Sequence, residues 1–157
     1  MDIVVRRAGK PDAKSISRLN ADIQSVHAAA FPDLFKPPSV DSQPPATITD
    51  LIRMPENVFF LAELEGEPVG YAYAEVIRRP ETPWRLAQDM VYLHHISVRP
   101  AHRRKGIGEA LLRAVRAAGE DHGITLLATD VWTFNEPARR FFARQGLAPY
   151  VEKLWSR

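Results

Sequence analysis

Three cations stand directly before two glycines near the middle of the chain, within the stretch ISVRPAHRRKGIGEALL at residues 96–112. This group consists of Arg103, Arg104, Lys105, Gly106, Ile107 and Gly108. Apolar residues then recur at Leu111 and Val115, which predicts a helix over residues 107–122. The start of a helix presents backbone N–H groups without an intrahelical partner, and glycine lets an anion approach them closely. The stretch is therefore a candidate phosphate site.

Two familiar phosphate-binding motifs do not fit this stretch. A P-loop needs four residues between its glycines and then Lys-Ser or Lys-Thr, which this stretch lacks. A dinucleotide fingerprint needs a third glycine three residues after the second, where the chain has Leu111. In isolation, a tight turn flanked by solvated arginines explains the two glycines equally well. A nucleic-acid site on residues 99–105 is the least favoured alternative, because no aromatic residue interleaves those cations.

The hydrophobic pattern predicts the elements that must position this loop. Strands are expected at residues 3–7, 58–63, 69–77, 91–98 and 124–132, and helices at residues 47–53, 107–122 and 137–145, with a first helix that opens at Lys10-Pro11-Asp12. The residues after Gly146 are expected to close the sheet. Residues 31–45 carry five prolines, so we expect an ordered irregular loop there.

The length of 157 residues predicts one domain over residues 1–157. The absence of cysteine excludes disulfides, thiolate metal sites and thiol nucleophiles. The net charge of +2 is too small to indicate nucleic-acid binding by itself, and no segment has the apolar length of a signal peptide or a membrane span. We therefore expect a cytoplasmic protein that binds neither nucleic acid nor membrane. Five scattered histidines do not form a ligand set, so no metal is expected.

The cationic loop and a second motif together resemble the GCN5-related N-acetyltransferases. Residues 103–108 match the RxxGxG loop that binds pyrophosphate in this family, and LHHISVRP before them is similar to its central strand. The residues that match the family's second cofactor motif are Asn135, Ala138, Phe141, Phe142 and Gly146. The similarity to these motifs runs from about Val91 to Tyr150. It implies an α+β fold, in which helices flank a mixed, mostly antiparallel sheet that splays between its fourth and fifth strands.

The resemblance implies acetyl-CoA as co-substrate, held where these two strands splay. The residues expected at it are Ile96, Ser97, Val98, Arg103, Arg104, Lys105, Gly106, Ile107, Gly108, Asn135 and Phe142. Backbone groups of Ile96 and Val98 would pair with the pantetheine amides, and N–H groups of residues 104–108 would hold the pyrophosphate. At least one of the two arginines is expected to contact phosphate. Asn135 would contact the pantetheine arm, although a helix N-cap explains this residue equally well.

Transfer of acetyl to an amine requires a base, because a protonated amine cannot attack a carbonyl group. His94 is the preferred base, since the usual pKa of histidine is about 6.5 and the family places catalytic residues at positions that match Tyr92 and His94. Strict alternation puts these two on the same side of the strand as Ile96 and Val98, unless a bulge reverses the faces. Glu75 is a second candidate, as a base or as a carboxylate that attracts the amine. A histidine satisfied by a neighbour and a solvated carboxylate are the purely structural alternatives.

One departure from the family concerns the aromatic pair. Many relatives carry a tyrosine as the second aromatic residue, where it protonates the departing thiolate, whereas this chain has Phe142. Tyr92, Tyr150 or water could take over that role. Two functions therefore remain in view: direct acetyl transfer to a primary amine of a small molecule or peptide in a ternary complex, and an acyl-CoA-binding sensor without turnover.

The acceptor is expected to enter opposite the cofactor, between residues 31–45, residues 78–90 and the last strand. The candidates for the wall of this pocket are Phe31, Phe35, Trp84, Trp132 and Trp155. Core packing explains aromatic residues equally well. The resemblance also allows a homodimer.

Overall fold

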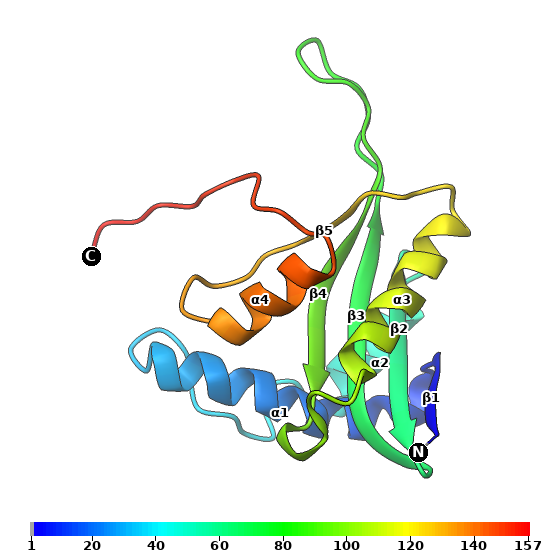
Figure 1. The fold of residues 1–157 in the computed structure, drawn as a ribbon, viewed down its shortest axis with the longest axis vertical. Coiled ribbons are helices and arrows are strands. Elements are labelled where there is room, and N and C mark those ends of the chain that lie inside the picture. The colour runs from blue at the N-terminus through cyan, green and yellow to red at the C-terminus, as the bar shows by residue number, and fades with distance from the viewer. Residues whose placement is uncertain (1) are drawn as a thin grey trace.

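A five-stranded sheet forms the middle layer of the computed structural model, which describes residues 2–157 (Figure 1). In their order across the sheet, the strands are β1 (Ile3–Arg7), β2 (Asn57–Leu64), β3 (Glu67–Ile77), β4 (Met90–Val98) and β5 (Leu127–Thr129). The first four strands pair antiparallel, whereas β4 and β5 run parallel. The expected α+β fold with a mixed, mostly antiparallel sheet is confirmed.

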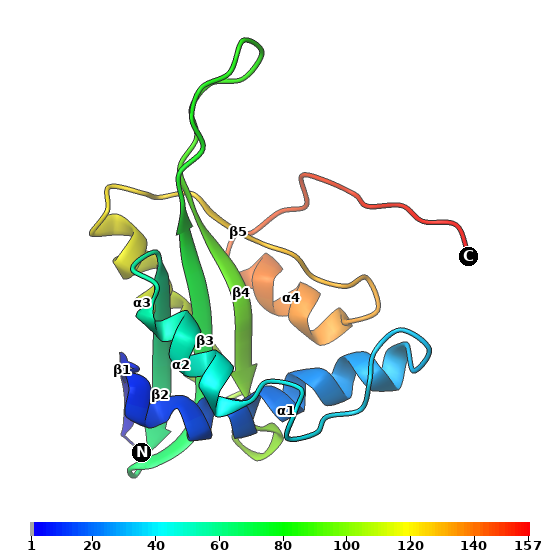
Figure 2. The same cartoon turned by 180° about the vertical axis from the view of Figure 1, so that it is seen from behind.

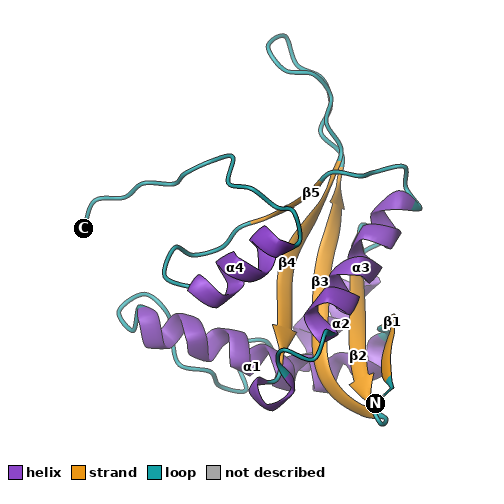
Figure 3. Cartoon of the chain, in the orientation of Figure 1, coloured by secondary structure: helices purple, strands orange, loops and turns teal. Residues whose placement is uncertain are grey.

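Helices cover both faces of this sheet (Figures 2 and 3). The helices are α1 (Ala13–Ala30) and α2 (Pro45–Arg53) on one face, and α3 (Ile107–Glu120) and α4 (Glu136–Arg144) on the other. Short 3-10 turns at Lys10–Asp12 and Pro100–His102 lie ahead of α1 and α3. The four helices therefore lie close to the positions that the sequence predicted.

Two apolar cores, one on each face of the sheet, join the layers. The core beneath α3 includes Ile107, Leu111, Val115, Val91 and Leu93, and the core beneath α1 and α2 includes Ile16, Leu19, Ile48, Tyr71 and Tyr73. The α3 residues recur every four positions, so they form one stripe along the helix. Burial of each such side chain contributes roughly 1.5–3 kcal/mol. The packing of Val91 and Leu93 against α3 therefore holds the part of β4 that directly precedes His94.

A β-bulge interrupts β4 at His94. Across the β3–β4 ladder, Tyr73 pairs with His95 and Ala74 pairs with Leu93, so His94 has no partner residue on β3. The extra residue reverses the alternation of the side chains that follow it.

The bulge separates side chains that strict alternation had grouped together. Ile96 and Val98 pack against the core on the α3 face. The His94 ring instead stacks on Tyr73, which belongs to the core on the α1 face, and contacts the Tyr92 ring. The prediction that all four residues share one side is therefore wrong, because one inserted residue shifts the register.

The fourth and fifth strands separate after a short contact, as the resemblance implied. β5 pairs with β4 over three residue pairs, from Val91–Leu127 to Leu93–Thr129. The ladder ends where Thr129 Oγ1 donates a 2.8 Å hydrogen bond to the Leu93 carbonyl oxygen. Beyond Leu93, β4 continues to Val98 without a β5 partner.

Two strand predictions near the end of the chain are wrong. β5 is shorter than the expected strand at 124–132, because the N–H of Ile124 bonds back to the Gly119 carbonyl oxygen at the end of α3. Residues 148–157 contain no strand, and they run away from the sheet in Figure 1. Pro149 has no N–H to donate to a ladder, and Tyr150 and Val151 are exposed.

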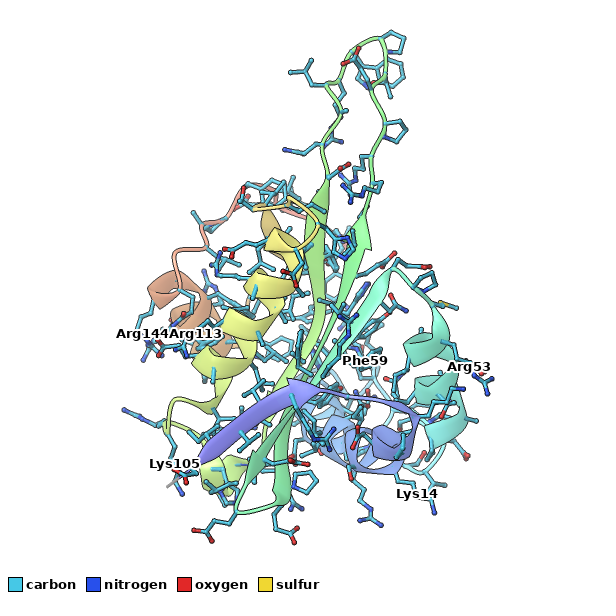
Figure 4. The ribbon with its side chains drawn as sticks, turned by 90° about the vertical axis from the view of Figure 1, so that its right-hand side faces the viewer. Lys14, Arg53, Phe59, Lys105, Arg113 and Arg144 are labelled. Carbon is cyan, nitrogen blue, oxygen red and sulfur yellow. The ribbon has the colours of Figure 1, made fainter. Side chains whose placement is uncertain are left out.

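Residues 78–89, between β3 and β4, form an arm that projects beyond the sheet (Figure 4). An ion pair between Arg78 and Asp89 joins the two sides of the arm, and Thr82 pairs with Arg85 near its tip. Trp84 is 85% exposed there. The Trp84 side chain therefore faces solvent at the tip of this arm.

Candidate active site

His94 and Glu75 meet beside the point where β5 leaves β4. His94 Nε2 lies 2.7 Å from Glu75 Oε2. The His94 ring stacks on Tyr73, with ring centroids 4.6 Å apart and planes inclined by 17°. The His94 and Glu75 side chains are 31% and 33% exposed, so both can be reached from solvent. The fold thus brings together two of the three residues that the sequence nominated for catalysis.

The bond to Glu75 selects one tautomer of His94. An ionised carboxylate accepts hydrogen bonds and donates none, so the hydrogen between the two groups belongs to His94 Nε2. In the neutral ring, His94 Nδ1 then carries the lone pair. This nitrogen is the atom that can take a proton, while the bond to Glu75 holds the ring in place.

Tyr92, the third nominated residue, lies against the same histidine. The Tyr92 ring is edge-on to the His94 ring, with centroids 4.9 Å apart. Burial, followed by the hydrogen bond and the negative charge of Asp130, raises the pKa of Tyr92 to about 12. Its hydroxyl therefore keeps its proton at neutral pH and is a weaker acid than the hydroxyl of an ordinary tyrosine.

Beneath this group lies a buried polar relay that sequence reasoning missed. Asn20 Nδ2 donates a 2.9 Å hydrogen bond to the Tyr71 hydroxyl, which lies 3.0 Å from His95 Nδ1. Because the hydroxyl accepts from Asn20, its own hydrogen is free for His95 Nδ1. Burial, then the charges of His94 and His27, lower the pKa of His95 to about 4. His95 is therefore a neutral, structural neighbour of His94; the signal for the relay was a polar residue, Asn20, on the apolar face of α1.

The cationic loop has an unusual backbone conformation. Arg104 and Gly106 both have positive φ, at 63° and 81°. Gly106 is the N-cap of α3 and makes no side-chain capping bond, so the first N–H groups of the helix are left for another acceptor. Successive turns of this kind point backbone N–H groups into a shared anion-binding hollow. Arg103, Arg104 and Lys105 are exposed around it, and Figure 4 shows Lys105 near the start of α3.

One arginine of the loop also ties it to the sheet. Arg103 Nε donates a 3.0 Å hydrogen bond to the Val98 carbonyl oxygen at the end of β4. The cationic loop and the unpaired part of β4 are therefore held next to each other. Ser97 was also predicted to contact the cofactor. Its hydroxyl instead donates a 3.3 Å hydrogen bond to the Leu19 carbonyl oxygen in α1. Only the backbone of Ser97 is left for the gap beside β4.

Two residues of the second cofactor motif, Asn135 and Phe142, make contacts within the fold. The Asn135 side chain accepts a 3.3 Å hydrogen bond from the Ala138 N–H and so caps α4. Phe142 is buried in the core on the α3 face. Phe141, rather than Phe142, lies at the cationic loop. Its ring is so close to Gly108 that a Cβ added to this glycine would lie 3.4 Å from Phe141 Cε2. The Asn135 amide nitrogen remains free of that capping bond.

Aromatic rings from three distant segments gather beyond the end of α1. This aromatic cluster consists of His27, Phe31, Phe35, Trp132, Phe134 and Trp155. Its centroid distances run from 5.1 Å for His27–Phe35 to 6.4 Å for His27–Trp132. Four of the five residues expected to wall an acceptor pocket therefore lie together, and the exception is Trp84 on the arm.

Two broader features bear on the site. Within residues 2–157, no group of three or more His, Cys, Asp or Glu side chains is arranged to hold a metal ion. Across the same described residues, the helices are all too short or too polar to cross a bilayer.

Most of the chain matches the sequence pattern of one known protein family. Residues 21–147 match the Acetyltransferase (GNAT) family. An uncharacterized N-acetyltransferase in the pepI 3′ region of Lactobacillus delbrueckii subsp. lactis is 27% identical over 107 residues, or 66% of this chain. The L-2,4-diaminobutyric acid acetyltransferase of Nocardia farcinica is 31% identical over 83 residues, or 53% of this chain. The matched segments span 59% and 39% of these relatives' own length.

Solved structures share the fold at low sequence identity. A tetramutant of the BH1408 protein from Bacillus halodurans superposes with a TM-score of 0.93 at 21% identity, covering 98% of this chain and 99% of that one. The aminoglycoside acetyltransferase AAC(6′)-Iy, in complex with the bisubstrate analogue CoA-S-monomethyl-acetylneamine, gives a TM-score of 0.77 at 18% identity, covering 100% and 98%. These similarities extend the match from the motifs to the whole fold.

Proposed function

Because the chain belongs to the acetyltransferase (GNAT) family, we propose that it transfers an acetyl group from acetyl-CoA to a primary amine of a small molecule or peptide. The transfer is direct, within a ternary complex of protein, acetyl-CoA and amine. The chain has no cysteine that could carry the acetyl group as a thioester intermediate.

One observation carries this proposal: the bonded His94–Glu75 pair lies at the bulge where β4 loses its β5 partner. A base is thereby placed beside an unpaired strand edge, which is the type of backbone that binds an amide-containing chain. A general base needs to be within reach of the proton that it removes, and this pair is open to solvent.

The residues around the gap fit the co-substrate. The turns at Arg104 and Gly106, with their exposed cations, suit a diphosphate. The backbone of Ile96 and Val98 would pair with the amides of the pantetheine arm, and the Asn135 amide nitrogen would bond to the same arm. Bound acetyl-CoA would supply the acetyl group as a thioester, whose C–S bond breaks as the amine nitrogen forms the new C–N bond.

The residues of this chain then move two protons. His94 Nδ1 takes the proton of the ammonium group, so that a neutral amine attacks, and Glu75 stabilises the imidazolium that forms. The Tyr92 hydroxyl gives its proton to the departing thiolate, since Phe142 cannot. The attacking nitrogen loses its second proton as the amide forms, and water carries that proton back to the Tyr92 oxygen. A thiolate is a tolerable leaving group without this help, because thiols have a pKa of about 8.5, so the Tyr92 contribution is the smaller of the two.

Release of free thiol from acetyl-CoA against a panel of amines tests the proposal. We expect amine-dependent release that is lost in His94→Ala. The matched variant is His122→Ala, which removes an exposed histidine beyond α3 and should leave release unchanged. Binding of CoA without turnover on any amine would contradict the proposal and favour an acyl-CoA sensor.

A further inference from the structure

A positively charged side chain already sits in the aromatic cluster. The guanidinium carbon of Arg157 lies 5.2 Å from the ring centroid of Phe31 and 4.7 Å from that of Trp155. Arg157 Nη1 is also 3.0 Å from Asp33 Oδ2. The faces of aromatic rings attract cations at this range, and a carboxylate adds a charged acceptor. Two rings and one carboxylate thus form a binding place for a cation.

The interactions that hold Arg157 in this site are weak enough for another cation to replace its guanidinium group. The side chains of Arg157 and Asp33 are 45% and 66% exposed. An exposed ion pair contributes little to stability, because water and salt screen it. A soluble cation that offers the same charge can therefore displace the Arg157 guanidinium without disturbing the core.

The cation site also adjoins the candidate catalytic group. Phe31 contacts Trp132, with centroids 5.7 Å apart, and Trp132 contacts His27. His27 is near enough to His95, the neighbour of His94, for their charges to interact. Ring contacts thus lead from Trp155 through Phe31 and Trp132 to His27. Figure 2 shows the last residues of the chain on the same side of the molecule as the far end of α1.

Resting on the function proposed above, we propose that Phe31, Trp155 and Asp33 form a subsite for a second positive charge on the acceptor. Arg157 occupies this subsite in the free protein as an internal substitute. The acceptor class is then an amine that carries a second ammonium or guanidinium group at its far end. A monocationic amine of similar length makes no use of the subsite.

Binding of agmatine, which carries one amine and one guanidinium group, tests the subsite without any acetyl transfer. The chain has three tryptophans, and Trp132 and Trp155 lie in the cluster. In a Trp84→Phe background, the fluorescence of these two should change saturably with agmatine and should change much less with pentylamine. Asp33→Asn and Phe31→Leu should each weaken agmatine binding by about two- to fivefold. Asp41→Asn, an exposed aspartate of the same loop, should leave it unchanged.

Arg157 provides the sharpest comparison. Arg157→Gln removes the internal competitor, so agmatine should bind about two- to tenfold more tightly, whereas Arg157→Lys should stay near the parent protein. Equal or weaker binding by Arg157→Gln would overturn the proposal, as would full binding by Asp33→Asn.

Turnover separates this proposal from the function on which it rests. Both are supported if agmatine is acetylated with a higher kcat/KM than pentylamine and Asp33→Asn removes the difference. Equal kcat/KM for the two amines overturns the subsite and leaves acetyl transfer standing. The binding pattern above, with no turnover of any amine, overturns acetyl transfer and leaves the cation site standing.

Discussion

His94 Nε2 lies 2.7 Å from Glu75 Oε2, although the two residues belong to different strands and are 19 positions apart. Glu75 pairs with Tyr92, so regular alternation along β4 puts His94 on the face that carries Glu75, and the His94 ring stacks on Tyr73 there. A histidine held by a carboxylate has one defined tautomer and a fixed ring orientation. The pair therefore has the properties of a general base with its orienting partner.

The first prediction concerns this pair. His94→Ala should lower kcat/KM by about 10²- to 10⁴-fold, the usual contribution of a general base. Glu75→Gln should lower it less, by about 10- to 100-fold, since an amide also permits the unproductive tautomer. Glu67→Gln, an exposed glutamate at the other end of β3, is the control and should have no effect. Initial rates from about pH 6 to about pH 9 check the assignment, and full activity of His94→Ala across that range rules out His94 as the base.

The second prediction concerns the proton donor. Tyr92→Phe should lower kcat by roughly tenfold and leave the KM for acetyl-CoA unchanged, because the hydroxyl acts on the departing thiolate alone. With the pKa of Tyr92 raised to about 12, the parent protein should show no loss of activity from tyrosine ionisation up to about pH 10. Tyr150→Phe, which removes an exposed hydroxyl, is the matched control. An unchanged kcat in Tyr92→Phe would assign the proton to Tyr150 or to water.

The third prediction separates backbone strain from phosphate binding. Gly106→Ala forces a Cβ onto a residue with φ of 81°, which costs roughly 1–2 kcal/mol. Gly66→Ala, in the β2–β3 turn with φ of 82°, imposes the same strain outside the cationic loop. Both variants should lose similar stability to urea, but only Gly106→Ala should weaken CoA binding, by about tenfold or more. Calorimetric titration with CoA measures this, and equal CoA affinities in the two variants would remove the loop from the cofactor site.

The fourth prediction concerns stability and pH. Burial lowers the pKa of His95 to about 4, whereas histidine in an unfolded chain has a pKa of about 6.5. Between these values the unfolded chain binds the proton and the folded chain does not, so stability rises with pH. The contribution is complete above about pH 6.5 and is lost as pH falls to about 4, for a total of about 3 kcal/mol. Urea unfolding across this window should show a flatter dependence on pH in His95→Gln; an unchanged slope would contradict the prediction.

Much of the fold followed from the sequence because local patterns decide it. The apolar stripe of α3, the apolar runs of β2 and β3, and the two glycines beside Ile107 identify their elements from neighbouring residues alone. The strand predicted at 124–132 and the expected closing strand failed because pairing is a long-range property. A bond from Ile124 back to Gly119, and Pro149 without an N–H, end strands that the composition favours.

The sequence by itself determined the types of residue at the site: cations beside Gly106 and Gly108, His94 and Glu75 on expected strands, and aromatic residues spread from Phe31 to Trp155. Tertiary structure alone decided which of them meet. The bulge left His94 on the face of Glu75 and put Ile96 on the opposite face, because one unpaired residue inverts a period of two. Packing among distant segments gathered Phe31 with Trp155 around Arg157, and no pattern within any one segment encodes that contact.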